Sequence, residues 1–360
     1  MHLYLHIPFC RRICPYCGFY KHTPGKLANR AFVDAVLAEA ELRGSGFAPR
    51  TVFFGGGTPS LLSPALLRRL MSGLAQRLDL SQVEEWTVEA NPATFDAAKA
   101  ELLREGGADR ISLGVQSFEP DVLATLGRDH SPADAEAAFH TLRGAGFANL
   151  SIDLMFSIPG QSRAHWLADL DRAVALAPEH VSAYNLTYEE DTEFLDRHRQ
   201  GELDSDEDRD AELFHLAADR LAAADYLHYE ISNYARPGFE SKHNRAYWSG
   251  ADYLGLGPGA VSTLDGRRWR NLPDTAGYVR ALDAGIDPRI EFETLGAEER
   301  RLEALAMQLR TREGAPRELA ADEDAVARLA GTGWIELRGG RIVLTREGKA
   351  LADPIAAQLA

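Results

Sequence analysis

Short runs of apolar, β-branched and aromatic residues alternate with longer amphipathic stretches from the start of the chain to about residue 260. The short runs predict strands, because turn residues bound them and they are too short for helices. Strands are expected at residues 3–7, 51–54, 86–90, 110–115, 150–156, 180–187 and 229–233. The stretches between them have helical periodicity. Helices are expected at residues 30–43, 64–78, 96–105, 132–145, 164–175 and 206–224.

This alternation predicts an α/β fold whose strands are parallel and joined by right-handed crossovers. Six or more such units in one domain favour a partial or complete (β/α) barrel over an open doubly wound sheet. The glycine fingerprint GxGxxG does not follow the first strand, so a dinucleotide-binding sheet has little support.

The pattern changes after about Gly296. A helical run at 297–309 leads to a second helical run, then to two short strands at 334–337 and 341–344, and finally to a helix at 346–359. This order predicts a winged-helix-like α+β domain at residues 296–360, after a barrel domain at residues 1–295. Eleven acidic and ten basic residues nearly cancel in the C-terminal part, so we expect it to serve in packing and not in DNA binding.

Composition and charge narrow the class of protein. The chain has 360 residues, of which 45% are hydrophobic and 26% charged, an ordinary balance for a globular protein. Its net charge of −15 argues against nucleic acids and anionic lipid surfaces as partners. The N-terminal sequence does not have the pattern of a signal peptide, and no apolar run is long enough to span a membrane. We therefore expect a cytoplasmic protein that is not an integral membrane protein.

All three cysteines, Cys10, Cys14 and Cys17, lie within eight residues, which leaves none for a disulfide elsewhere. Cysteine thiolates are the usual ligands of iron–sulfur clusters, and a [4Fe–4S] cluster normally has four of them. Three ligands leave one iron free to bind a small molecule, which favours a catalytic or cofactor-binding site. The spacing C-x3-C-x2-C is also the signature of radical S-adenosylmethionine (SAM) proteins. Zinc with His6 or His22 is the alternative, although such sites usually have four ligands and paired C-x2-C units.

The sequence GGGTPS at residues 55–60 follows the second predicted strand. Glycines allow the backbone to approach a ligand closely, because they have no Cβ. Taken alone, such a loop is most simply a tight turn. In a barrel that begins with this cysteine spacing, we expect it to contact the amino group of SAM through backbone carbonyls.

Four polar residues, Glu89, Gln116, Arg128 and Asp153, lie at or after the ends of predicted strands. The chemistry of (β/α) barrels takes place at the carboxyl ends of their strands. A carboxylate can accept hydrogen bonds from both hydroxyls of a ribose, and an arginine can pair with the methionine carboxylate. Each residue also has a structural interpretation, as a helix cap or as a surface ion pair that contributes little.

The segment His243–Trp248 (HNRAYW) is the third candidate feature. Imidazole can be an axial ligand of haem iron, and aromatic rings can stack on a porphyrin. The residues alone favour a simpler interpretation, a half-buried loop histidine beside two core aromatics, because single histidines rarely bind metal without partners.

Taken together, these segments resemble the HemW family of radical SAM haem chaperones, which is similar to the oxygen-independent coproporphyrinogen III oxidases. The resemblance extends over nearly the whole chain. It rests on Tyr4 with HIPFC, then FFGGGTPS, VEANP, RISLGVQSF, LGRDH, IDLMFSIPGQ, HVSAYNLTYE, YEISNYARPG, HNRAYW and YLGLGPGA.

The resemblance implies a [4Fe–4S] cluster on Cys10, Cys14 and Cys17, with SAM chelating the fourth iron. The residues that it implies as SAM contacts are Tyr4, Gly57, Glu89, Gln116, Arg128 and Asp153. The haem-binding residues that it implies are His243, Asn244, Tyr247 and Trp248, with His243 as the axial ligand. The implied partners are haem and a haem-accepting protein, with a membrane or respiratory haem protein among the candidates.

Three functions remain open at this stage. The first is a haem chaperone. The second is the radical decarboxylation of coproporphyrinogen III to protoporphyrinogen IX, and the third is another radical SAM reaction. The oxidases have a fourth cysteine where this chain has Phe19, and they have a longer segment before the cluster motif than the nine residues that precede Cys10 here. Both differences favour the chaperone. Two other departures, Val261 and Ser241 in place of the histidine and cysteine common in the chaperone family, put haem contacts from those positions in doubt.

Overall fold

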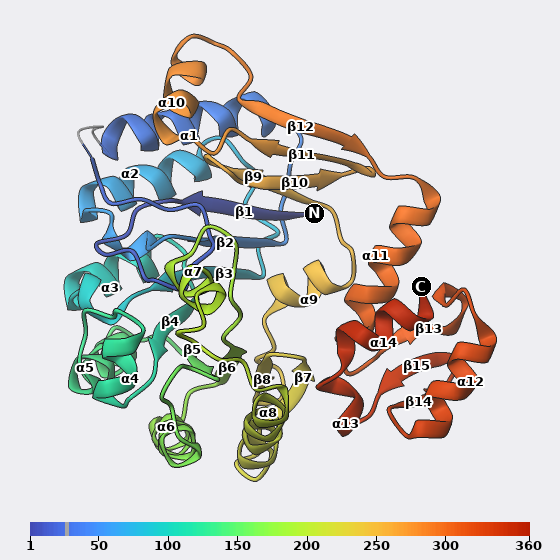
Figure 1. Ribbon diagram of the computed structural model, residues 1–360. Helices are drawn as coiled ribbons and strands as arrows, with labels where there is room; N and C mark the ends of the chain where they lie inside the picture. Colours follow the sequence, from blue (N-terminus) through green and yellow to red (C-terminus); the bar gives the residue numbers. More distant parts are fainter. Residues whose placement is uncertain (26–28) are drawn as a thin grey trace.

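The computed structural model describes residues 1–25 and 29–360, and its centre is one twelve-stranded sheet. Six strands follow one another in chain order and pair in parallel. They are β1 (His2–Ile7), β2 (Thr51–Gly56), β3 (Glu85–Ala90), β4 (Arg110–Gln116), β5 (Asn149–Phe156) and β6 (His180–Asn185). The sheet curves into a partial barrel with helices on its outer side, which confirms the predicted fold class (Figure 1).

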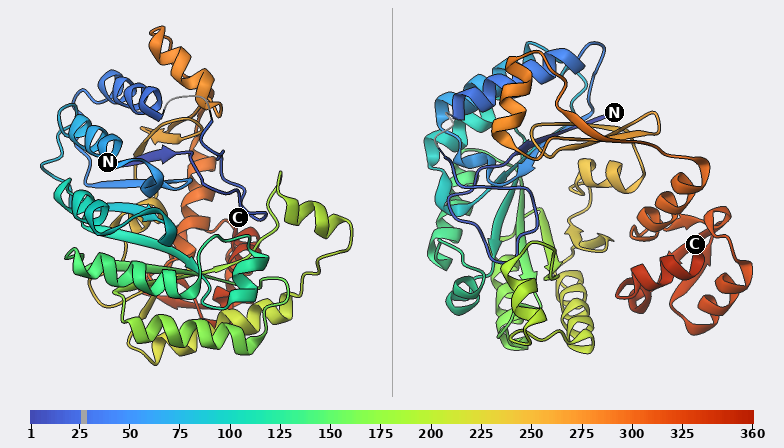
Figure 2. Two further views of the ribbon diagram at one scale, coloured as in Figure 1. Left: turned by 90° about the vertical axis from the view of Figure 1, so that its left-hand side faces the viewer. Right: turned by 45° about the horizontal axis from the view of Figure 1, so that its top comes forward.

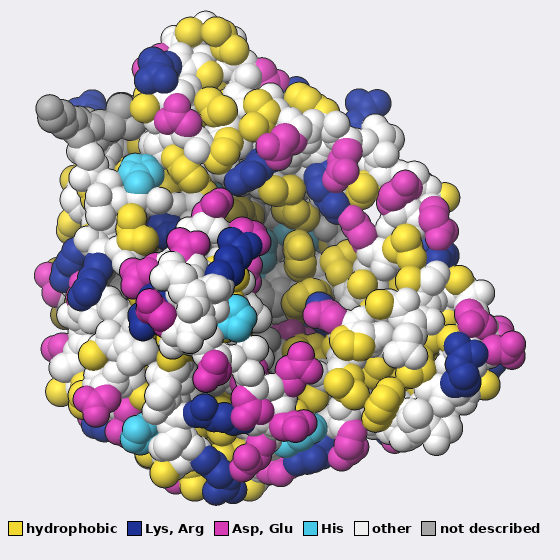
Figure 3. Space-filling model, in the orientation of Figure 1, with side chains coloured by type: hydrophobic (Ala, Val, Ile, Leu, Met, Phe, Trp, Pro, Cys, Tyr) yellow, Lys and Arg dark blue, Asp and Glu magenta, His cyan; other side chains and the backbone are white. Residues whose placement is uncertain are grey.

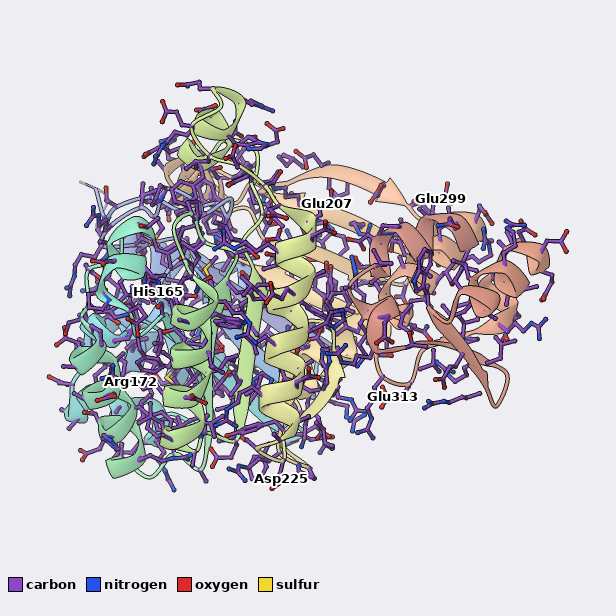
Figure 4. All side chains as sticks on the ribbon, turned by 60° about the horizontal axis from the view of Figure 1, so that its bottom comes forward. His165, Arg172, Glu207, Asp225, Glu299 and Glu313 are labelled. Atoms are coloured by element: carbon purple, nitrogen blue, oxygen red, sulfur yellow. The ribbon has the colours of Figure 1, made fainter. Side chains whose placement is uncertain are left out.

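Helices follow the strands as expected, with ends within about three residues of the predicted ones. The long helices are α1 (Asn29–Arg43), α2 (Pro64–Ala75), α3 (Ala97–Glu105), α5 (Pro132–Gly144), α6 (Arg163–Leu176) and α8 (Glu207–Ala222). Short helices η1 (Pro59–Leu61), η2 (Pro92–Thr94), α4 (Pro120–Thr125) and α7 (Glu193–Arg199) lie in the loops. Helix α8, which begins at Glu207, lies beside α6, which carries His165 and Arg172 (Figure 4), and Trp166 of α6 donates a hydrogen bond to the Leu213 carbonyl of α8.

Successive side chains of a strand point to opposite faces, and the two faces of this sheet differ in chemistry. The outer face is apolar, as Leu3 and Leu5 on β1 and Ile111 and Leu113 on β4 show, and it packs against the helices in the main hydrophobic core. The inner face carries polar side chains, such as Arg110 on β4, that line cavities. The fold therefore builds a polar barrel interior inside an apolar shell.

The sheet is extended beyond β6 by antiparallel strands, which corrects one prediction. Residues 229–233 do not form a single strand, since β7 (Leu227–Glu230) and β8 (Asn233–Ala235) make a hairpin there. Strand β8 pairs with β6 in antiparallel orientation. The turn falls at Ile231 and Ser232. The Glu230 carboxylate accepts hydrogen bonds from the Ser232 N–H and from the side-chain amide of Asn233, the first residue of β8. Serine and asparagine favour turns, but the aromatic and apolar residues around them led to the prediction of one strand.

The other edge of the sheet was not predicted. Strand β9 (Tyr253–Leu256) pairs with β1 in parallel, and β10 (Val261–Leu264), β11 (Arg267–Asn271) and β12 (Arg289–Thr294) add antiparallel strands. Helix α9 (Lys242–Trp248) precedes this unit, and α10 (Thr275–Asp283) is inserted in it. Asp265 and Gly266, both with positive φ, form the tight turn between β10 and β11.

The C-terminal part has a hydrophobic core of its own, from Leu305 to Leu359, and lies beside the barrel (Figure 2). Its elements are α11 (Ala297–Leu309), β13 (Ala315–Pro316), η3 (Arg317–Leu319), α12 (Glu323–Thr332), β14 (Ile335–Arg338), β15 (Arg341–Leu344), α13 (Arg346–Lys349) and α14 (Ala352–Leu359). The three strands form a separate antiparallel sheet. The predicted final helix is therefore two helices. Pro354 explains the break, because a proline ring clashes with the carbonyl four residues earlier in a continuous helix.

The division of the chain at residues 295 and 296 stays a prediction. It is supported by β12, which belongs to the large sheet, and by α11, which contributes Leu305 and Leu309 to the second core. Within the described residues, no helix is long and apolar enough to cross a membrane.

Candidate functional site

The three cysteines lie in the loop that follows β1, at the carboxyl ends of the parallel strands. Backbone hydrogen bonds fix this loop: Cys10 N–H donates to the His22 carbonyl at 3.0 Å, and Thr58 N–H donates to the Phe9 carbonyl at 2.8 Å. The segment Phe9–Cys10 is thus hydrogen-bonded both to His22, at the end of the cysteine loop, and to Thr58, in the loop after β2.

The cysteines line a cavity of about 650 Å3 at this end of the barrel. It brings together most of the predicted cluster and SAM residues, namely Cys10, Cys14, Cys17, Gly57, Glu89, Gln116, Arg128 and Asp153. Tyr4 is the exception, since it lines a second cavity, and its predicted role as a SAM contact gains no support from that placement.

Polar groups surround the thiols. The Thr58 hydroxyl donates to Cys10 Sγ at 3.7 Å, Arg128 Nη1 lies 3.8 Å from Cys14 Sγ, and the Lys21 ammonium donates to the Cys17 carbonyl. Burial raises the pKa of the Cys10 and Cys17 thiols, whereas the Lys21 charge opposes that shift. In residues 1–25 and 29–360, no three His, Cys, Asp or Glu side chains are grouped to hold a single metal ion.

Two carboxylates in this cavity have different environments. Asp153 accepts hydrogen bonds of 2.8 to 3.0 Å from the hydroxyls of Ser112, Ser151 and Ser182. Glu89 accepts one hydrogen bond of 3.2 Å from Gly56 N–H. Burial, and next the Asp153 charge, raise the pKa of Glu89 to about 8. Glu89 is therefore largely protonated at neutral pH, so that it can donate as well as accept a hydrogen bond.

The glycines at the end of β2 have a structural role that the sequence did not indicate. A Cβ at Gly57 would lie 2.8 Å from the carbonyl oxygens of Ile7 and Phe9, and a Cβ at Gly56 would lie 2.5 Å from the His6 ring. These glycines are required because the loop packs directly on β1 and the segment leading to the cysteines. A contact of the loop with SAM stays a prediction, for which Gly57 is suitably placed on the cavity wall.

The second cavity, of about 1060 Å3, lies between α9 and strands β10–β12. His243, Asn244, Tyr247 and Trp248 all line it, so the predicted haem residues are brought together. It is rich in aromatic side chains, since Phe53, Tyr253, Trp269 and Phe292 also line it. Figure 3 shows this face of the molecule hollowed, with hydrophobic side chains along one side of the hollow.

The sheet itself anchors α9. Ser241 caps the helix by accepting from Asn244 N–H, and the Glu85 carboxylate accepts from the Ser241 hydroxyl and from the backbone N–H of Lys242 and His243. Glu85 is the first residue of β3. Its negative charge at the helix N-terminus is favourable. Ser241 therefore has a structural role here, as the cap that joins α9 to β3.

His243 has one ring nitrogen bonded to the sheet. Its Nδ1 lies 2.7 Å from the hydroxyl oxygen of Thr51, while its Nε2 has no hydrogen bond among the described residues. Burial, and next the neighbouring His2, lower the pKa of His243 to about 3, so its imidazole is neutral at physiological pH. A neutral imidazole is the form that binds metals.

The two cavities share part of their walls. Gly18, Phe19, Phe53, Gly56, Glu89, Tyr184 and Asn244 line both. Residues predicted for the cluster and SAM thus border those predicted for haem.

Comparisons with known proteins identify the family. Residues 4–173 match the radical SAM superfamily. The chain is 38% identical over 315 residues to the heme chaperone HemW of Lactococcus lactis subsp. lactis, covering 86% of this chain and 82% of that protein. It is 38% identical over 362 residues to the heme chaperone HemW of Mycobacterium tuberculosis, covering 98% and 93%. The chain belongs to the HemW family of radical SAM proteins.

This membership confirms the resemblance drawn from the motifs, and the radical SAM superfamily implies a [4Fe–4S] cluster and SAM. Among solved structures, coproporphyrinogen III oxidase (HemN) from Escherichia coli, a radical SAM enzyme, matches with a TM-score of 0.86 and 22% identity. The match covers 99% of this chain and 89% of that one. It shows that the two proteins share a fold.

Sequence reasoning missed several cavity residues, among them Thr58, Lys21 and Arg110. The signal for Arg110 was available. Polar residues alternate with Ile111, Leu113 and Val115 along β4, and this period of two places Arg110 on the inner face. An arginine at an inward position of a barrel strand is unusual enough to have been a candidate.

Proposed function

We propose that this protein is a haem chaperone, which binds a [4Fe–4S] cluster, SAM and haem and delivers the haem to a haem protein. One observation carries the proposal: a cavity with three thiols adjoins an aromatic cavity that contains His243, across a shared wall. The name of the relatives, heme chaperone HemW, supports it.

The first cavity suits a cluster with SAM. Three free thiols are the correct donors for iron, and the Arg128 Nε is buried without a hydrogen-bond partner, as expected of a group that awaits an anionic ligand. When bound, the cluster presents an iron without a protein ligand, to which SAM can chelate. Arg128 would hold the SAM carboxylate, and Glu89 and Asp153 would accept the ribose hydroxyls. Gln116 and the Gly57 backbone complete the proposed set.

The second cavity suits haem as cargo. His243 offers a neutral ring nitrogen, and Tyr247 and Trp248 offer aromatic faces. Tyr247 is 47% exposed and Phe292 is 64% exposed, so the cavity is open toward the solvent. An open site is suited to passing haem on to a haem-accepting protein, for which respiratory membrane proteins are candidates. Free cysteines are stable in a reducing compartment, which supports the expected cytoplasmic location.

An anaerobic haem titration of the reconstituted protein tests this function. Saturable binding at about one haem per chain is expected, with an affinity that His243→Ala lowers by at least tenfold, because the axial ligand is lost. His140→Ala, at an exposed position on α5, is the matched control and should bind haem like the wild type. If no saturable binding occurs, or if both variants behave alike, the proposed haem site is wrong.

Radical decarboxylation of coproporphyrinogen III is the other outcome to measure. The same reconstituted protein is incubated with SAM, a reductant and coproporphyrinogen III. Release of carbon dioxide with formation of protoporphyrinogen IX would replace the chaperone function by the oxidase activity. We expect none, since Phe19 occupies the position of the fourth cysteine of the oxidases.

A further inference from the structure

Arg110 is a buried cation with no partner of its own. It is 2% exposed, its Nε has no hydrogen-bond partner, and no ion pair among residues 1–25 and 29–360 includes it. It nevertheless lines the first cavity. A buried charge is costly unless a counter-charge or hydrogen bonds compensate it, so an unpaired buried guanidinium requires an explanation.

The nearby carboxylates are engaged elsewhere. Glu85 caps α9 by accepting from Ser241, Lys242 and His243. Asp153 accepts from three serine hydroxyls. Glu89 accepts a hydrogen bond from Gly56 N–H, and burial and the Asp153 charge raise its pKa to about 8 although the Arg110 charge opposes this shift, so Glu89 is no fixed counter-charge. None of these groups supplies the anion that Arg110 lacks.

The position of Arg110 indicates which ligands can reach it. It is the first residue of β4, where it pairs with Thr87 of β3, and so it lies deep in the barrel below the predicted SAM residues. Asn244, the neighbour of His243 on α9, lines the same cavity and also the second one. A ligand in the first cavity therefore meets this guanidinium directly, and a ligand in the second cavity lies next to Asn244, which borders both cavities.

We propose that Arg110 is an anion-binding residue that pairs with a carboxylate of the ligand in the barrel interior. The planar fork of arginine suits a carboxylate, with two parallel hydrogen bonds. This inference deepens the proposed function and rests on it, because that function supplies two ligands with carboxylates: haem with its propionates, and SAM, whose single carboxylate Arg110 would share with Arg128.

Binding titrations of the reconstituted full chain distinguish the two sources. Haem is compared with haem dimethyl ester, whose propionates are blocked, and SAM with decarboxylated SAM. If the partner is a propionate, Arg110→Gln weakens haem binding by roughly 10- to 100-fold and leaves the ester unaffected. If it is the SAM carboxylate, the same loss appears for SAM and not for decarboxylated SAM. Arg163→Gln, an exposed residue that pairs with Glu212 on the barrel exterior, is the matched control.

Three results would overturn the assignment. The first is that Arg110→Gln binds haem and SAM within about twofold of the Arg163→Gln control, a difference too small for a charged hydrogen bond. The second applies if Arg110→Gln does not fold, in which case Arg110→Lys, which keeps the charge but not the planar guanidinium, is measured instead. If Arg110→Lys still prefers haem to its dimethyl ester, and SAM to decarboxylated SAM, as strongly as the wild type does, the two parallel hydrogen bonds proposed for Arg110 are excluded. The third is a wild-type chain that binds neither probe, which would also overturn the proposed function. A chain that binds SAM but no haem contradicts only the chaperone, and the SAM comparison then decides the role of Arg110.

Discussion

The imidazole of His243 and the hydroxyl of Thr51 lie 2.7 Å apart, joining α9 to the first residue of β2. Because Thr51 is buried in the sheet, the contact fixes both the orientation of the imidazole ring and its distance from β2. Partners of this kind orient metal-binding histidines and set which nitrogen is available. The Nε2 atom is thereby left for a ligand in the second cavity.

Thr51→Val should weaken haem binding without removing it. The change keeps the shape of the side chain but leaves His243 Nδ1 and His2 Nδ1 without their common partner. We expect about a 5- to 10-fold loss of haem affinity, consistent with one unsatisfied buried hydrogen bond. Thr141→Val, on the exposed side of α5, is the control for the loss of a threonine hydroxyl. Equal haem affinity in the two variants would show that Thr51 does not orient the ligand.

Cys14→Ala should abolish the cluster and spare haem. Two thiols cannot hold a [4Fe–4S] cluster stably, so the iron content and the brown absorbance should fall to near zero after reconstitution. Haem affinity is expected to stay within about threefold of the wild type, because a mutation outside the haem contacts adds little. Simultaneous loss of iron and of haem binding would mean that the two sites depend on each other. The test is needed because the two cavities share lining residues.

Arg128→Ala should weaken SAM binding and leave the cluster in place. Arg128 donates to the Gly114 carbonyl at 2.7 Å and approaches Cys14 Sγ, but it is not an iron ligand. We expect SAM affinity to fall by about 10- to 100-fold, the usual range for a charged hydrogen bond. Isothermal titration with SAM and iron analysis on the same sample provide the test. An unchanged SAM affinity contradicts the assigned role, and so does a loss of iron equal to that of Cys14→Ala.

Glu89→Gln should change the pH dependence of stability. The folded-state pKa of Glu89 is raised to about 8, so between pH 5 and pH 8 the folded state holds a proton that the unfolded state has lost. Stability therefore falls as pH rises through this window. For the protein without cofactors, the free energy of unfolding should fall between pH 5 and pH 8 by on the order of 2 kcal/mol more in the wild type than in Glu89→Gln. Denaturant melts at the two pH values measure the difference, and parallel curves would show that Glu89 titrates normally.

Much of the barrel could be predicted because its signals are local. Each of the six parallel strands is a short apolar run, and each long helix has its own period and, in most cases, a capping residue, such as Ser131 before α5 or Ser162 before α6. The hairpin at β7 and β8 and the strands β9–β12 were not recognised. Their pairing depends on partners distant in the sequence, such as β9 with β1, and short strands rich in charge carry little periodicity.

The candidate site was predictable as a set of residues, and less so as an arrangement. Motif spacing identified Cys10, Cys14 and Cys17, and the structure brings them to one cavity with Glu89 and Asp153. The sequence could not show that Gly57 packs against the backbone of the segment before the cysteines. Nor could it show that the predicted haem residues, His243 to Trp248, adjoin the cavity with the cysteines. Those facts depend on how α9 docks at the start of β3, through Glu85. No local pattern in the sequence reports such a contact.

The apolar shell of the barrel has a consequence for the life of the polypeptide in the cell. The main core is built by residues such as Leu5, Ile111 and Leu113, which face away from both cavities, so folding does not depend on what fills them. We therefore expect the polypeptide to reach its folded state with both cavities unfilled, so that loading with a ligand follows folding and is not a condition of it.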